Sequence, residues 1–185
     1  ADVIICDDGL QHYRLARDLE VGVVDGRRRF GNGRLLPAGP MREPVSRLGH
    51  VDWVICNGGV PRGSEIGMQL AGRLLHSLRD GSIVGIEEFR GRRCHAVAGI
   101  GHPLRFFDML CAHGIEVEDH PFPDHHAFRA QDLIFPSGLP VLMTEKDAVK
   151  ASVFSLENAW YLEVDAALPR EWETAFLARI MQEKS

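Results

Sequence analysis

The chain has 185 residues, of which 45% are hydrophobic and 25% are charged, so it carries enough apolar material for one ordinary core or two small ones and is not a disordered protein. Its formal net charge of -5 gives no overall attraction to nucleic acid, and we expect no nucleic-acid partner. Four widely spaced cysteines form no C-x-x-C pair, which predicts reduced thiols. No apolar run approaches the roughly 18 residues of a membrane-spanning helix.

The first part of the chain predicts short buried strands that end in polar residues. Residues 3–6 are an apolar run ended by two aspartates, and residues 21–24 are a second such run. A long loop rich in Gly and Pro follows over residues 26–44, and residues 51–56 predict a third strand. Because a natural chain seldom begins inside its own core, we expect Ala1 to be a cut edge.

A looser segment then separates two regions. Residues 68–86 alternate in short pieces broken by glycines, which indicates a β-ribbon that links two domains, with residues 1–80 in the first and 81–185 in the second. Alternation of strands and helices beyond this point predicts a mainly parallel α/β sheet. The elements expected there are a strand at 96–98, a helix from 103 with Leu104, Phe107, Met109 and Leu110 turned inward, strands at 141–144 and 160–164, and a final helix with Trp172, Phe176, Leu177 and Ile180 on one face.

The first motif with chemical content is the pair Asp7 and Asp8, followed by Gln11 and His12. Adjacent carboxylates at a strand end repel each other unless a cation lies between them, so the pair favours Mg²⁺ and bound phosphate. The alternative is that the Asp pair caps a helix that follows, which Asp8 can do without a metal.

The long loop holds a second motif, with three arginines at 27–29 and the pair Arg42 and Glu43 near its end. Cations on a glycine-rich loop can close over an anion, and Glu43 can supply another oxygen to a metal. The alternative is that the arginines are ordinary solvated surface.

Three further motifs lie in the second region. An Asp next to His125 and His126 can orient an imidazole as a proton acceptor or a ligand, although a His pair can equally be structural. The glycines at 99 and 101 form a weak anion-binding signal, and tight packing explains them as well. Residues 144–147 have the pattern of a helix cap first and of a site second.

Taken together, these segments resemble the tetraacyldisaccharide 4′-kinase family, the lipid A kinases. The segments that carry the resemblance run in order along most of the chain: DDGLQHYRLARD (7–18), VVDGRRRFGNGRLLPAGPMREPVSRL (23–48), GIGHPLRFF (99–107), FPDHHAF (122–128) and VLMTEKDAVK (141–150). The resemblance implies the C-terminal portion of a P-loop NTPase-like parallel sheet plus a second, smaller Rossmann-like α/β domain.

The resemblance also implies an activity and a set of residues. The activity is transfer of the γ-phosphoryl group of ATP to the 4′-hydroxyl of a lipid A disaccharide precursor, at the cytoplasmic face of the bacterial inner membrane. Asp7, Asp8 and Glu43 are then the Mg²⁺ ligands, Gln11, His12 and Arg42 contact substrate, and Asp8 and His125 act in catalysis. Leu10, where the family often has Phe, is expected to change only packing.

Other family parts do not occur in the 185 residues. They hold no G-x-x-x-x-G-K-[ST] loop, and the family's upstream catalytic aspartate and its N-terminal membrane-associating helix have no match. Since the P-loop supplies much of the phosphate binding, this chain alone is expected to be inactive. Two other hypotheses about the function stay open. The chain is a metal-dependent phosphoesterase that uses Asp7, Asp8 and the Asp-His-His motif, or a non-catalytic lipid-head-group-binding module built on residues 27–34.

Overall fold

A computed structural model describes residues 3–182, and its fold is α/β, a mixed sheet of mostly parallel strands with helices, as the sequence predicts. The chain divides into two compact units, the first made of Ala1–Leu70 and Ala166–Ser185 and the second of Ala71–Asp165. The elements are β1 (Val21–Asp25), β2 (Trp53–Asn57), β3 (Ile66–Ser77), β4 (Ile83–Gly85), β5 (Arg93–Ala98), α1 (Pro103–Ala112), β6 (Glu116–Pro121), α2 (Ala130–Leu133), β7 (Val141–Thr144), α3 (Glu145–Ala151), β8 (Ala159–Ala167) and α4 (Arg170–Gln182), with short 3₁₀ helices at Val45–His50 and Ile86–Phe89.

The first unit is built on parallel strand pairing. Strand β1 pairs with β2 from Val21 opposite Trp53 to Asp25 opposite Asn57, and β2 continues into parallel pairing with the start of β3. A glycine follows each of the strands β1 and β2, and the two glycine backbones are in contact. A Cβ on Gly26 would lie 1.6 Å from the carbonyl oxygen of Gly58. The loops that follow the two strands therefore leave the sheet side by side.

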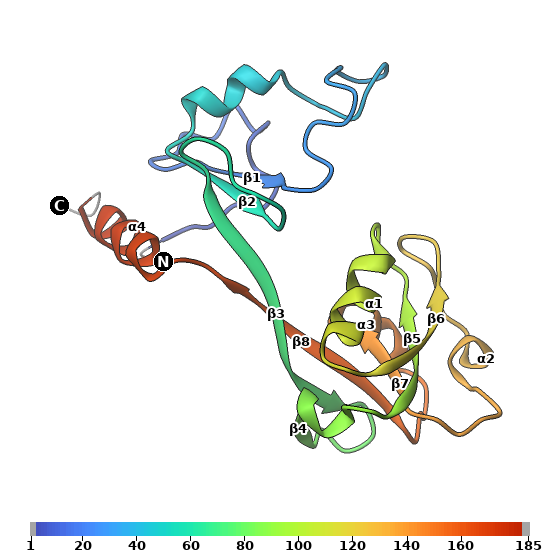
Figure 1. Cartoon of the computed structure of the whole chain (residues 1–185). Coiled ribbons are helices and arrows are strands. Elements are labelled where there is room, and N and C mark those ends of the chain that lie inside the picture. Colours follow the sequence, from blue (N-terminus) through green and yellow to red (C-terminus); the bar gives the residue numbers. More distant parts are fainter. Residues whose placement is uncertain (1–2, 183–185) are drawn as a thin grey trace. The chain divides into compact units, whose positions relative to one another are not determined.

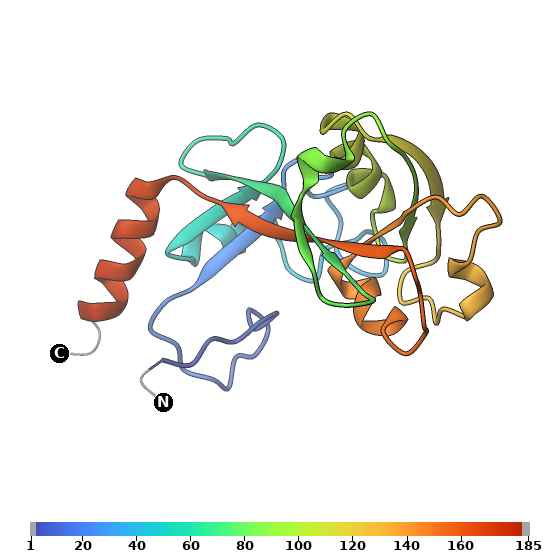
Figure 2. The same ribbon diagram turned by 90° about the horizontal axis from the view of Figure 1, so that it is seen from below.

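The helix α4 belongs to the first unit, although the sequence predicts it in the second domain. Its Trp172 and Phe176 pack edge-on against Trp53 of β2, with ring centroids 6.1 and 5.7 Å apart. The final strand β8 carries the chain back from the second unit directly into this helix, drawn in red in Figure 2. Of the face predicted for this helix, Leu177 is exposed instead. The two compact units thus differ from the predicted ranges 1–80 and 81–185.

The strand predicted at residues 3–6 is wrong for this structure. The segment has no regular secondary structure, and Ile4 and Ile5 are 84% and 91% exposed. A strand needs a neighbour to satisfy its backbone N–H and C=O groups, and none of the described residues pairs with this segment.

The second unit is a sheet with both faces covered (Figure 1). Strand β5 lies between β6 and β7 with parallel pairing on both sides, β7 pairs parallel with β8, and the end of β3 forms a hairpin with β4. Alternate residues of β5 enter different cores, since Ala96 packs in the cluster that contains α1 and Val97 in the cluster that contains α3. The strand predicted at 141–144 is confirmed as β7. It is a continuous apolar run because side chains on both of its faces are buried.

Two parts of the second unit differ from expectation. In α1 the buried side chains are Phe106, Phe107 and Leu110, whereas Leu104 is exposed. Strand β6 was not predicted, because its sequence Glu-Val-Glu-Asp-His-Pro is polar. It is the edge strand of the sheet and pairs only with β5 among the described strands. Its residues are exposed or only partly buried, so polar side chains are tolerated there.

Candidate functional site

Four of the residues proposed from the sequence meet in the first unit. The Arg42 guanidinium donates through Nη1 to both carboxylate oxygens of Asp8, at 3.1 and 2.8 Å, and to Gln11 Oε1 at 3.3 Å. Gln11 Nε2 in turn donates to Glu43 Oε1 at 2.8 Å. We call Asp8, Gln11, Arg42 and Glu43 the acid–arginine network. It joins the turn after residues 3–6 to the end of the long loop, two segments that the sequence separates by about thirty residues.

A backbone turn presents the Asp8 side of the network. Asp8 has a φ of 49°, in the left-handed region that Asp and Asn tolerate better than most residues. Its own N–H donates to Asp7 Oδ1 at 2.9 Å, which fixes the two carboxylates in one turn. The N–H of His12 closes the same turn on the carbonyl of Gly9 at 3.0 Å.

Glu43 is held as an ionised carboxylate. Hydrogen bonds from the Tyr13 hydroxyl and the Gln11 amide, helped by the charges of Arg47 and Arg17, hold the pKa of Glu43 below its ordinary value despite partial desolvation. The same Tyr13 bond raises the pKa of the tyrosine. Arg47 also contacts Glu43 Oε2 at 3.4 Å from Nε. The carboxylate of Glu43 is therefore ionised at neutral pH and offers oxygen atoms as ligands.

The long loop folds back on itself and so positions Arg42 and Glu43. Residues Leu35 and Met41 form an isolated β-bridge, and Asn32 Nδ2 donates to the carbonyl of Ala38 at 2.8 Å. Gly39 lies against this turn so closely that a Cβ would stand 2.2 Å from Asn32 Oδ1. The glycines and prolines seen in the sequence thus fix the path of the loop.

One arginine of the predicted cationic loop is committed elsewhere. Arg29 donates through Nη1 and Nη2 to the two oxygens of Glu65, at 2.9 and 2.5 Å, with both side chains largely buried. Arg29 has a positive φ of 51° within the loop. The charge of Arg29 is thereby neutralised, and it does not add to an anion-binding face at residues 27–34.

This ion pair predicts a pH dependence. The Arg29 hydrogen bonds lower the pKa of Glu65 from 4.5 to about 2, against desolvation, so its stabilising effect is complete above pH 4.5 and is lost as the pH falls from 4.5 through 2. In acid titrations followed by circular dichroism, we expect Glu65→Gln to lose less stability than the parent chain as the pH falls from 4.5 to about 2. Glu157→Gln, at an exposed ion pair, is the control and should behave like the parent chain. Equal curves for Glu65→Gln and the parent chain would contradict the role of the pair.

A cavity of about 810 Å³ lies beside the acids within the first unit. Its wall includes Asp7, Asp8 and Gln11 together with the exposed apolar residues of the 3–6 segment, and Phe176 and Ile180 of α4 close another side. The wall combines charged and apolar side chains, which suits a ligand or a further protein segment with both characters.

In the second unit, three of the sequence motifs converge at the carboxyl ends of β5 and β7. The fully buried Asp147 accepts the Gly99 N–H at 2.8 Å, the Thr144 hydroxyl at 2.7 Å and Lys150 Nζ at 2.9 Å. A Cβ on Gly99 would approach Asp147 Oδ1 and the Phe128 ring to 3.2 Å each, so any side chain here would crowd both neighbours. Ligands of open parallel sheets bind at this end of the strands.

The two histidines of the Asp-His-His motif differ in their surroundings. His126 lies against the Phe122 and Phe128 rings and contacts Asp132 Oδ2 at 3.2 Å through Nε2, which is a structural role. His125 has a φ of 60° and a side chain that is 76% exposed, with Nε2 3.8 Å from Asp124 Oδ2. His125 is therefore the member of the pair that is presented to solvent.

Asp124 is the charged partner of His125 in this unit. Its Oδ1 accepts the His125 N–H at 3.0 Å and contacts Lys146 Nζ at 3.4 Å. Desolvation raises the pKa of Asp124, but the charges of His125 and Lys146 and these hydrogen bonds outweigh it, so the pKa lies below its ordinary value. Asp124 is thus an ionised carboxylate beside an exposed imidazole, and Lys146 brings a second family segment to the same place.

The family model for tetraacyldisaccharide-1-P 4′-kinase matches residues 1–181. The chain belongs to this family. Curated relatives named tetraacyldisaccharide 4′-kinase include those of Nitrosococcus oceani, 48% identical over 98% of the chain and 53% of the relative, and of Stenotrophomonas maltophilia, 52% identical over 97% of the chain and 56% of the relative. The chain thus spans about half the length of the curated relatives that it matches.

A solved structure of the same family has a similar fold. It is that of LpxK from Aquifex aeolicus in complex with ATP, with a TM-score of 0.67 and 26% identity, which covers 93% of this chain and 55% of that one. Membership of the kinase family and the α/β fold expected from the resemblance are both confirmed.

The Mg²⁺ ligands expected from the resemblance are not gathered as one three-ligand group. Among residues 3–182, Asp8 is bound to Arg42 and Glu43 to Gln11, and the carboxylates of Asp7, Asp8 and Glu43 do not meet at a common point. Arg42 is the cation that neutralises Asp8 here. The donors are nevertheless carboxylate oxygens, the type that Mg²⁺ prefers. Their role as metal ligands stays a prediction, as do the roles of His12 and His125.

No helix within residues 3–182 has both the length and the apolar character needed to cross a lipid bilayer.

Proposed function

We propose that this chain is the acid-bearing portion of a lipid kinase that transfers the γ-phosphoryl group of ATP to the 4′-hydroxyl of tetraacyldisaccharide 1-phosphate, in lipid A biosynthesis at the cytoplasmic face of the inner membrane. Family membership supports the reaction, and the ATP complex of the Aquifex aeolicus relative supports the co-substrate. The observation that carries the proposal is the acid–arginine network, in which two distant family segments bring acids and a cation together beside a cavity.

The residues of this network and the neighbouring Asp7 and His12 have complementary roles in our proposal. Asp7, Asp8 and Glu43 would hold Mg²⁺, which neutralises phosphate charge during phosphoryl transfer when it is bound. Arg42 is a guanidinium already positioned beside the acids, and its fork geometry suits phosphate oxygens. Gln11 and His12 orient the acceptor sugar, and Glu43 fixes Gln11 and thereby the turn that carries Asp8.

His125 has a separate role in the proposal. An exposed imidazole next to an ionised carboxylate can accept and return a proton near neutral pH. We infer that His125 acts with a further aspartate of the longer family members to remove the proton from the 4′-hydroxyl. Asp124 and Lys146 keep the His125 backbone in its turn.

The proposal is tested by extending the chain. The 185 residues hold no P-loop, so we expect no ATP-dependent phosphorylation of tetraacyldisaccharide 1-phosphate by the chain alone. A chimera with the N-terminal part of the Nitrosococcus oceani relative placed before residue 1 should carry out the transfer, because that relative is 48% identical over the shared part. Radiolabelled ATP and separation of the lipid product measure both.

Two results of that experiment would contradict these expectations. Transfer by the 185 residues alone would contradict the expected inactivity. A chimera that binds ATP and keeps its circular dichroism spectrum but does not phosphorylate the lipid would contradict the proposed function.

A further inference from the structure

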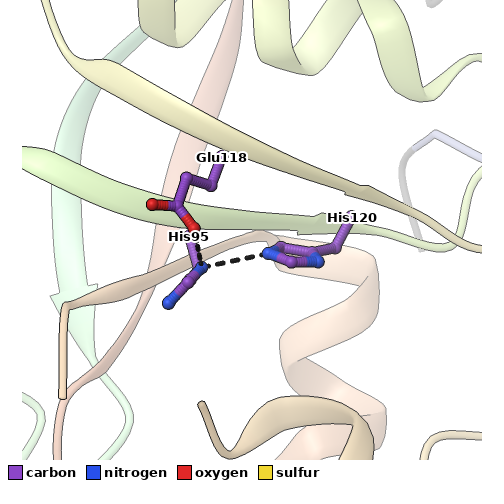
Figure 3. Close-up of side chains that lie close together, drawn as sticks. All are labelled: His95, Glu118 and His120. Atoms are coloured by element: carbon purple, nitrogen blue, oxygen red, sulfur yellow. Dashed lines mark hydrogen bonds and ion pairs between the residues drawn. The ribbon is translucent and has the colours of Figure 1, made fainter. Parts of the chain in front are cut away.

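Three potential metal ligands lie on one face of the β5–β6 pair, and none of them belongs to a motif discussed above. His95 of β5 is opposite Glu118 of β6 in the parallel register, and His120 follows Glu118 by two residues. Because alternate residues of a strand share a face, all three side chains project to the same side of the sheet. Figure 3 shows them pointing toward one another.

The distances between their donor atoms suit a small divalent ion. His95 Nδ1 lies 3.0 Å from His120 Nε2 and 3.3 Å from Glu118 Oε2, and donor atoms of the three residues all lie within 4.8 Å of one another. Tetrahedral zinc with bonds of about 2.0–2.1 Å places its ligand atoms about 3.3 Å apart. Two of the three separations are near this value, and the partly exposed Glu118 can adjust the third.

The surroundings of His95 complete the pattern of a metal ligand. Its ring is nearly fully buried, stacked on Phe135 with centroids 3.9 Å apart, and its Nε2 faces the Ser137 hydroxyl at 2.7 Å. When one ring nitrogen binds a metal, the other usually donates a hydrogen bond that fixes the ring. Ser137 is placed to accept that bond, and it leaves Nδ1 directed at His120 and Glu118.

A hydrogen-bonded cluster without metal is the competing explanation. In that case one proton lies between the rings, either on His95 Nδ1 and shared with His120 Nε2 and Glu118 Oε2, or on His120 Nε2 and donated to His95 Nδ1. Glu118 Oε1 also accepts from the exposed Arg93 at 2.7 Å, which holds its other oxygen toward His95. Three acceptor atoms around a single point are better satisfied by a cation than by one proton.

We propose that His95, Glu118 and His120 form a site for a divalent transition-metal ion, with Zn²⁺ as the best match. Two imidazoles and one carboxylate are a ligand set for Zn²⁺, whereas Mg²⁺ prefers oxygen ligands alone. Water takes the fourth position on the side where Glu118 is exposed. The bound ion links the edge strand β6 to β5 and so fixes the rim of the second unit.

Calorimetric titration of the 185-residue chain with Zn²⁺ tests the site. Excess Mg²⁺ is kept in the buffer so that carboxylate sites such as Asp7 and Asp8 do not report. We expect one saturable equivalent of Zn²⁺, a Kd raised at least about tenfold in Glu118→Gln, and a larger loss in His120→Gln. Asp119→Asn is the matched control, because Asp119 is exposed on the opposite face of the same strand and should leave the Kd unchanged.

Absence of saturable binding to the parent chain, or equal Kd values in the parent chain and both variants, would overturn the proposal. Circular dichroism without metal checks that Glu118→Gln and His120→Gln remain folded. Should either unfold, Co²⁺ bound to the parent chain decides instead, since four-coordinate Co²⁺ absorbs strongly in the visible range and six-coordinate Co²⁺ weakly. The strong spectrum supports the site, and the weak spectrum overturns it.

Discussion

Replacing Asp8 by Asn in the chimera that carries a P-loop is expected to lower the turnover number for lipid phosphorylation about 10³-fold. The amide keeps the size of the side chain and one acceptor for Arg42, which lies 2.8 Å from Asp8 Oδ2, but it removes the charge. A neutral side chain binds Mg²⁺ weakly and leaves the Arg42 charge without its partner. Steady-state assays with saturating ATP and lipid measure the turnover number directly.

Asp165→Asn is the matched control for this experiment, because it removes the same charge from an exposed strand position outside the network. Its turnover number should stay within about twofold of the unsubstituted chimera. If Asp8→Asn retained comparable activity, the proposed role of Asp8 as a metal ligand would be contradicted.

Replacing Asp147 by Ala is expected to lower the free energy of unfolding by about 3 kcal/mol. The carboxylate is 0% exposed and accepts from the Gly99 N–H and the Thr144 hydroxyl besides its ion pair with Lys150. Alanine leaves these donors without their acceptor and opens a space behind Gly99. Urea unfolding measures the loss, and thermal unfolding should shift downward by roughly 6–12 °C.

Glu145→Ala provides the comparison, since it removes an acid from the exposed side of the first turn of the same helix, α3. Only the interaction of Glu145 with the helix dipole is lost there, so a decrease below about 1 kcal/mol is expected. Equal losses for the two variants would mean that the buried carboxylate does not hold the motifs of the second unit together.

The sequence predicts the buried strands better than it predicts the elements at the edges. Residues 141–144 are a strand in the structure because a strand with both faces buried must be apolar throughout. The equally apolar segment 3–6 is not, because an apolar run specifies burial but does not supply the neighbour against which a strand pairs. Periodicity alone does not distinguish the two cases.

The sites follow the same division. The residues of the acid–arginine network are indicated by residue types and by the resemblance, since Asp8 and Arg42 occur in recognisable segments, whereas neither predicts that these side chains touch. The cluster of His95, Glu118 and His120 was missed because β6 has no apolar alternation. The signal that was available is the spacing of Glu118 and His120, two residues apart, which puts them on one face only if the segment is a strand.

The second unit interrupts the first, as its chain enters along β3 and leaves along β8. Near its two ends these strands touch, since a Cβ on Gly72 would stand 2.5 Å from the side chain of Leu162. Neighbouring strands are spaced about 4.8 Å apart, so entrance and exit need no long connection. The whole of Ala71–Asp165 is consequently an insertion whose two ends are adjacent, so that its length can vary without rerouting the remainder of the polypeptide.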